Sequence, residues 1–212
     1  MTVTTDTADL WAATHAERAA LADDLAGLTA AQWASPSLCA DWTVEDVVAH
    51  LTAAASIGRW RWIASMLGAR FDPAVHNARR LAEHRGATPA ETLARFRAVV
   101  TSSVGPTGHT AAWLGEVVVH GADIRRSLGL RRTAPVEITT PVLTFFTSRD
   151  FTVAGRTLSR GLRLRATDGP FTTGDGPEVR GSTLALVMAL AGRAAYLDDL
   201  EGPGVETLRE RL

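Results

Sequence analysis

Hydrophobic and polar positions in the first part of the chain alternate with the period of an amphipathic helix. Leu21, Leu25 and Leu28 fall on one stripe of such a helix. Thr43 has a carboxylate three residues later, at Asp46, which is a variant of the capping box that begins a helix. The pattern predicts four main helices, at about residues 6–29, 43–67, 88–105 and 109–128, and a short additional helix at 74–85. Helices joined by short connections favour a bundle.

The pattern changes after Gly129, a residue suited to end the fourth helix. The segment "LRRTAPVEITTPV" is typical of a domain boundary, and a helix is expected over about residues 140–157. Leu and Arg alternate in "GLRLRATD", which predicts a half-exposed strand, and Ser182 begins a last, apolar helix. We therefore predict an α+β chain with a helical bundle at residues 1–132 and a small α+β domain at residues 138–212.

Composition and charge narrow the class of protein. The chain has 212 residues, 46% hydrophobic and 21% charged, with a formal net charge of −1, so nothing in its bulk charge favours nucleic acid or an anionic membrane. The sequence shows no signal-peptide pattern and no apolar run of the roughly 18 residues that a membrane span requires. The single cysteine, Cys39, excludes an intrachain disulfide, and we expect it to be a small buried residue. The expected location is the cytoplasm.

Two histidines and one glutamate are the candidate metal ligands. The segment "GEVVVHGADIRRSLG" places Glu116 and His120 four positions apart, on one face of a mostly apolar helix. His50 lies two turns into an earlier helix, among alanines that leave room for a cavity. If the helices face each other, the three side chains converge and could hold Zn²⁺, Fe²⁺ or Ni²⁺ with positions left open. The alternative is that each is a core or surface residue without a metal.

Two segments resemble a known family. "LCADWTVEDVVAHLTAAA" and "EVVVHGADIRRSLG" are similar to the two signature helices of the mycothiol-dependent maleylpyruvate isomerases, a branch of the DinB-like four-helix bundles. "GDGPEVRGSTLALVMALAGR" resembles the small sterol-carrier-like domain of that family, so the resemblance covers nearly the whole chain. It implies a divalent metal, usually zinc, on His50, Glu116 and His120, and the thiol mycothiol as cofactor.

The resemblance implies a thiol-dependent enzyme that acts on a small electrophile. A thiol with a pKa of about 8.5 is deprotonated when it coordinates a metal, so the metal-bound thiolate of the cofactor is the expected nucleophile. It could add reversibly to an unsaturated acid, as in an isomerase, or stay attached, as in an S-transferase. Two other classes remain open: a non-catalytic protein that binds a metal or small ligand, and a metal-dependent hydrolase, although the sequence offers no HExxH-type base.

Four further residues are weaker candidates. Asp123, one turn after His120, matches the family motif and is expected to orient a ligand through a hydrogen bond, or else to serve the helix surface or its end. Arg61 lies on the predicted stripe of His50, and Arg79 and Arg80 follow in the next segment. These arginines are candidates for binding an anionic group of a cofactor or substrate, with a solvated side chain as the alternative.

Overall fold

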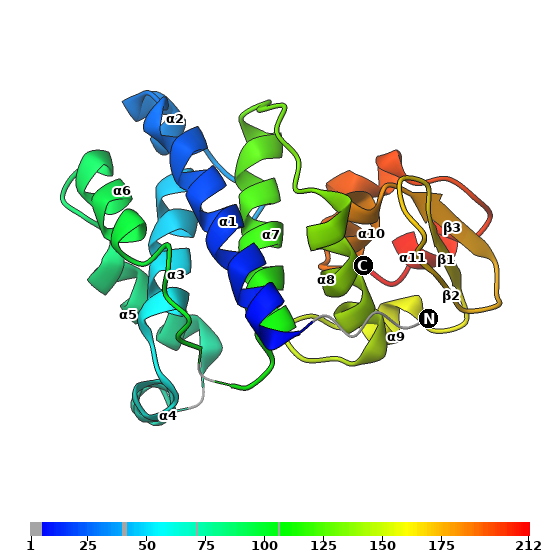
Figure 1. The fold of residues 1–212 in the computed structure, drawn as a ribbon, viewed down its shortest axis with the longest axis horizontal. Coiled ribbons are helices and arrows are strands. Elements are labelled where there is room, and N and C mark those ends of the chain that lie inside the picture. The colour runs from blue at the N-terminus through cyan, green and yellow to red at the C-terminus, as the bar shows by residue number, and fades with distance from the viewer. Residues whose placement is uncertain (1–5, 40–41, 71, 106) are drawn as a thin grey trace. The chain divides into compact units, whose positions relative to one another are not determined.

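A computed structural model of the chain describes residues 6–39, 42–70, 72–105 and 107–212. It contains two compact units, Met1–Arg131 and Arg132–Leu212. The first unit is helical, and the second combines helices with a small sheet, so the predicted α+β class is confirmed (Figure 1). Among the described residues, no helix has the length and apolar character needed to cross a membrane.

Four helices of the first unit pack in a closed ring. Neighbours in the ring are α1 with α7, α7 with α3, α3 with α6, and α6 with α1. Outside this ring α5 packs against α3, and α4 packs against α5 (Figure 1). The helices are α1 (Thr7–Ala26), α2 (Ala30–Trp33), α3 (Val44–Ser56), α4 (Arg59–Gly68), α5 (Pro73–His84), α6 (Pro89–Ala98) and α7 (Thr110–Ser127).

The interior of the ring is an apolar core to which every one of the four helices contributes. Leu21 and Leu25 of the predicted leucine stripe are buried in it, and Phe96 of α6 is fully buried. The residues that α3 and α7 add to this core are Val44, Val47, Val48, Leu51, Val117 and Ile124. Burying such side chains stabilises the fold by about 1.5–3 kcal/mol each, so the core by itself fixes how α3 and α7 face each other.

Two of the predicted helices end earlier than expected. The helix predicted over 43–67 is broken: Ile57 is extended after α3, and α4 begins after Gly58. Glycine is among the weakest helix formers, and at this position it favours a break over continuation. The helix predicted to reach residue 105 ends at Ala98. The run Val99, Val100 and Thr101 that follows is β-branched, which lowers helix propensity.

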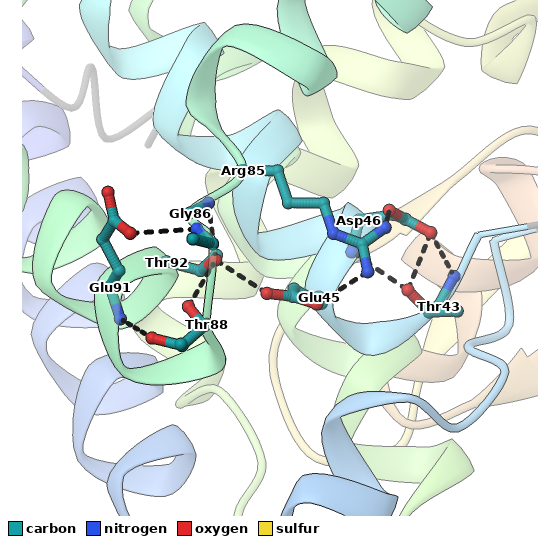
Figure 2. A network of polar contacts seen from close by, with 9 residues as sticks. Thr43, Glu45, Asp46, Arg85, Gly86, Thr88, Glu91 and Thr92 are labelled. Atoms are coloured by element: carbon teal, nitrogen blue, oxygen red, sulfur yellow. Dashed lines mark hydrogen bonds and ion pairs between the residues drawn. The ribbon is translucent and has the colours of Figure 1, made fainter.

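The beginning of α3 is held by a polar network that includes the predicted capping box (Figure 2). Thr43 and Asp46 each accept a hydrogen bond from the other's backbone N–H. Arg85, after α5, donates to both Glu45 and Asp46 at 2.8 Å. Glu45 also accepts a hydrogen bond from the hydroxyl of Thr92 on α6, at 2.8 Å. The network therefore joins α3 to the segment between α5 and α6.

The position of α7 is set at its C-terminal half. Arg125, which is buried, donates to Asp24 at 2.8 Å and lies 3.4 Å from Glu17, both on α1. Gly129 has a φ of 66°, and the backbone N–H of Leu130 donates to the carbonyl of Arg125 at 2.8 Å. This is the glycine-dependent helix end that the sequence predicts.

The second unit combines several helices with a three-stranded sheet. The order of strands is β2-β1-β3, with β1 antiparallel to β2 and parallel to β3, and α8 packs on α10. The strand predicted in "GLRLRATD" is β1. The elements are α8 (Val136–Ser148), α9 (Gly155–Ser159), β1 (Arg163–Ala166), β2 (Thr172–Thr173), β3 (Glu178–Gly181), α10 (Thr183–Leu190), a 3₁₀ helix η1 (Ala194–Asp199) and α11 (Val205–Arg209).

The helices of the second unit also differ in extent from the prediction. The helix expected over 140–157 is α8, which ends at Ser148. Asp150, in the segment after α8, accepts hydrogen bonds from the backbone N–H and the hydroxyl of Thr157 in the separate helix α9. The last apolar helix begins at the Ser182 cap as predicted but ends at Leu190. Gly192 then takes a φ of 84°, and this left-handed residue separates α10 from η1.

Candidate metal site

The structure brings His50, Glu116 and His120 together between α3 and α7. His50 lies on α3, and Glu116 and His120 lie one turn apart on α7. Nε2 of His50 is 3.3 Å from Oε2 of Glu116, and Nε2 of His120 is 3.4 Å from the same oxygen. The two imidazole rings meet edge to face with their centroids 4.9 Å apart. Both rings therefore present the same nitrogen to one carboxylate.

This cluster has the chemistry of a site for a divalent cation. One ligand atom of each side chain lies within 4.8 Å of the other two, which is close to the separation of ligands around a bound metal. Two imidazoles and a carboxylate suit zinc and related divalent ions. The side chains of His50 and Glu116 are 18% and 20% exposed, so the cluster lies at the surface of the core and remains accessible.

Trp42 covers the two imidazole rings from the loop that precedes α3. Its ring centroid lies 4.9 Å from that of His50 and 6.2 Å from that of His120. The loop is closed by Ser37, whose backbone N–H and hydroxyl both donate to the carbonyl of Trp42, at 2.9 and 2.8 Å. Trp42 thus forms one side of the cluster.

Hydrogen bonds and charges within the cluster favour an ionised Glu116 and a protonated His120, against the effect of burial. Burial disfavours the carboxylate of Glu116, but hydrogen bonds and charge from His120 and His50 outweigh it, so its pKa lies well below its usual value. Burial also disfavours a charged His120, yet hydrogen bonds with Asp123, Cys39 and Glu116 raise its pKa well above the ordinary histidine value. In the absence of metal, a proton on His120 is thus favoured, and a cation that binds there would replace it.

Asp123 is fully buried and lies beside the other nitrogen of His120. Its Oδ2 atom is 3.2 Å from Nδ1 of that ring. A carboxylate at Nδ1 holds the ring with Nε2 directed toward Glu116, which is the arrangement found around histidine ligands of metals. The position on the helix surface that was considered for Asp123 is excluded by its burial.

None of the three arginine candidates lies on α3, the helix that carries His50. Arg61 belongs to α4, because α3 ends before it, and its side chain is exposed. Arg79 donates to the carbonyl of Gly68 at 2.9 Å, and Arg80 pairs with Glu83. The pKa of His84, on the same helix as Arg79 and Arg80, lies below its ordinary value. Burial lowers it most. The positive charges of Arg80, Arg95 and Arg61 lower it further, and the negative charge of Glu83 raises it by less than these effects together. The placement of Arg61 on one helix with His50 is therefore wrong.

Cys39 is a neighbour of the cluster that sequence reasoning missed. It was expected to be an ordinary small buried residue, but it is half-buried, and its Sγ atom lies within 4.8 Å of ligand atoms of His120 and Asp123. No spacing in the sequence indicates this proximity, because Cys39 lies in a loop and His120 lies on α7.

The fold and the cluster together define an α+β protein whose N-terminal helical bundle carries a His–Glu–His group between two helices. Comparison with known proteins finds a family match for part of the chain. Residues 14–105 match the family described as "Mycothiol maleylpyruvate isomerase N-terminal domain". The predicted family resemblance is thus confirmed over these residues, which make up less than half of the chain. The matched residues include His50 and end before α7 begins.

The fold of the whole chain is also found among solved structures. It is similar to the crystal structure of a mycothiol-dependent maleylpyruvate isomerase, with a TM-score of 0.62 and 16% identity, and to that of a histidine-to-alanine mutant, with a TM-score of 0.63 and 17% identity. Each comparison covers 93% of both chains. At this level of identity the similarity establishes a shared fold over both units. No curated protein sequence matches the chain.

Proposed function

We propose that this protein is a zinc- and mycothiol-dependent enzyme that acts on a small electrophile such as an unsaturated acid. The reaction would be a thiol-mediated isomerisation or an S-transfer. Support comes from the family of residues 14–105 and from the fold shared with mycothiol-dependent maleylpyruvate isomerases. The proposed partners are a small-molecule thiol and its substrate, and the proposed location is the cytoplasm, where thiols are kept reduced.

The observation that carries the proposal is the convergence of two imidazole Nε2 atoms on one oxygen of Glu116. We propose His50, Glu116 and His120 as the ligands of the cation, because three protein ligands with an open position are typical of catalytic zinc. The negative charge of Glu116 would offset part of the charge of the cation. Asp123 would hold His120 in the orientation that directs Nε2 into the site.

The cation and the thiol together would supply a nucleophilic thiolate near neutral pH, which both proposed reactions require. The chain provides the conditions for this chemistry. Trp42 packs over both imidazoles. Cys39 is the single cysteine of the chain, so an enzyme that uses thiolate chemistry here either employs that side chain or takes its thiol from solution.

The first test is metal content. Protein expressed with zinc and purified without chelator should carry about one divalent cation per chain by elemental analysis, as expected for one three-ligand site. His50→Ala and His120→Ala should lose it. His84→Ala removes an imidazole outside the cluster and should retain the metal. An unmutated protein free of metal, or a His84→Ala protein that loses it equally, would contradict the proposed ligands.

The second test is thiol dependence. The protein is assayed on a panel of electrophiles and unsaturated acids with mycothiol, with glutathione, or without thiol. Activity should require mycothiol and should be lost in Glu116→Gln, whereas Glu91→Gln, which changes an exposed glutamate-arginine pair, should be unaffected. Equal rates with and without thiol would favour the hydrolase. Metal binding without activity on any substrate would favour the non-catalytic binding protein.

A further inference from the structure

A second group of ligand-type side chains surrounds His120. Ligand atoms of Cys39, His120 and Asp123 all lie within 4.8 Å of one another. Asp123 is fully buried, His120 is 8% exposed, and Cys39 is half-buried. A thiol, an imidazole and a carboxylate in this proximity form a complete three-ligand set for a cation, and the set differs in composition from His50, Glu116 and His120.

The two groups use opposite sides of the same ring. Glu116 lies 3.4 Å from Nε2 of His120, whereas Asp123 lies 3.2 Å from Nδ1. The carboxylate of Glu116 faces Nε2 of His120, and the carboxylate of Asp123 faces Nδ1. An ion bound by Asp123 and Cys39 would therefore occupy a different position from an ion bound by Glu116 and His50. His120 is the member that the two groups share.

Cys39 is held in this position by its own loop. Its backbone N–H donates to the hydroxyl of Ser37 at 3.0 Å, and its carbonyl accepts the backbone N–H of Trp42 at 3.1 Å. The same loop carries the ring of Trp42 onto His50 and His120. These hydrogen bonds hold the backbone of Cys39, and from this backbone position its Sγ atom lies within 4.8 Å of ligand atoms of His120 and Asp123.

We propose that Cys39, His120 and Asp123 form a second metal-binding group that selects thiophilic cations such as Cd²⁺. A thiolate ligand favours soft metals, whereas a set of two imidazoles and a carboxylate has no such preference. A neutral imidazole has only one nitrogen lone pair for a cation. A soft cation bound at Nδ1 of His120 with Cys39 and Asp123 therefore leaves Nε2 protonated, and Nε2 cannot then bind a cation beside Glu116. Occupation of the second group would thus disable the first. This proposal does not require that mycothiol is the cofactor.

The test isolates the second group by removing the first. Chelator-treated His50→Ala protein, kept reduced with a phosphine so that no small thiol is present, is titrated with Co²⁺ alone. Cys39 is the only cysteine of the chain, so a thiolate-to-cobalt absorption band can arise only from that residue. The band should appear in His50→Ala and disappear in His50→Ala/Cys39→Ser. Glu116→Gln provides a second background if His50→Ala disturbs the loop of Trp42.

Cadmium affinity gives an independent measurement in the same backgrounds. Cys39→Ser and Asp123→Asn should each weaken Cd²⁺ binding to His50→Ala protein by at least about tenfold, since even residues that only orient a metal ligand contribute this much. Glu91→Gln added to His50→Ala changes a glutamate that pairs with Arg95, away from both groups, and should leave the Cd²⁺ affinity unchanged. The proposal is overturned if saturating Co²⁺ gives no thiolate band in either background, if the band survives Cys39→Ser, or if Cd²⁺ affinity is insensitive to Cys39.

Discussion

The chemistry of the site depends most on a single residue, His120. Its Nδ1 atom is occupied by Asp123 and its Nε2 atom faces Glu116, so the neighbours of the ring decide which nitrogen can bind a cation. The spacing of Glu116, His120 and Asp123 on one helix is visible in the sequence, because residues three and four apart share a face. The contribution of Cys39 to the raised pKa of His120 is visible only in the structure.

Asp123→Asn should weaken zinc binding by roughly 10–100-fold, the usual effect of removing a carboxylate that orients a histidine ligand. The substitution keeps the shape of the side chain but replaces a charged acceptor at Nδ1 with a neutral amide. The measurement is competition for zinc against a chromophoric chelator. Asp23→Asn, at an exposed aspartate of α1, is the control and should retain full affinity. Equal affinity in the two variants would show that Asp123 has no part in ligand orientation.

The element that decides the geometry of the site is α3, which carries His50. Its first turn is anchored by the Thr43–Asp46 capping box and by Arg85 (Figure 2). Its last turn is followed by the break at Gly58. Glu45 is 7% exposed and depends on Arg85 and Thr92 for its hydrogen bonds. These contacts fix the residue at which α3 begins. They therefore also fix the position of His50 along the helix axis relative to Glu116 on α7.

Arg85→Ala should lower the free energy of unfolding by about 1–3 kcal/mol, because it leaves the buried carboxylate of Glu45 with one hydrogen-bond partner fewer. Arg97→Ala, at an exposed arginine of α6, should change it by no more than about 0.5 kcal/mol. Urea denaturation followed by circular dichroism compares the two variants. If Arg85→Ala is as stable as Arg97→Ala, the network contributes nothing to the stability of the bundle.

At the scale of the whole molecule, the bundle has a core that does not involve the metal ligands. The largest fully buried side chains of the first unit, such as Leu21, Leu51 and Phe96, are supplied by three different helices. The second unit has its own buried residues on α8 and α10, including Phe146 and Met188. The protein is thus unlike a zinc finger, in which metal binding supplies most of the folding free energy.

Removal of the metal should therefore leave the protein folded but less stable. Chelator-treated protein should keep its helical circular dichroism spectrum and unfold at a lower temperature than protein with zinc. Free zinc at 100 times the dissociation constant should add about 2.7 kcal/mol of stability. In His120→Ala, zinc should give no such increase. Loss of the helical spectrum on chelation would contradict this prediction and assign the metal a folding role.

Local patterns of the sequence determined the helices, their beginnings and the face that Glu116 and His120 share. These features depend on residues a few positions apart, so propensity, capping and helical periodicity suffice to predict them. The limits of α3 and α6 were predicted less well, since helix ends depend on small differences in propensity.

Only the tertiary structure decided which distant residues meet. His50 and Glu116 are 66 positions apart, and Arg85 and Glu45 are 40 apart. Helix periodicity alone does not specify which helices become neighbours; that follows from how the buried faces of α1, α3, α6 and α7 close around one core. The same closure places the loop of Cys39 against His120, a contact for which the chain has no local signal.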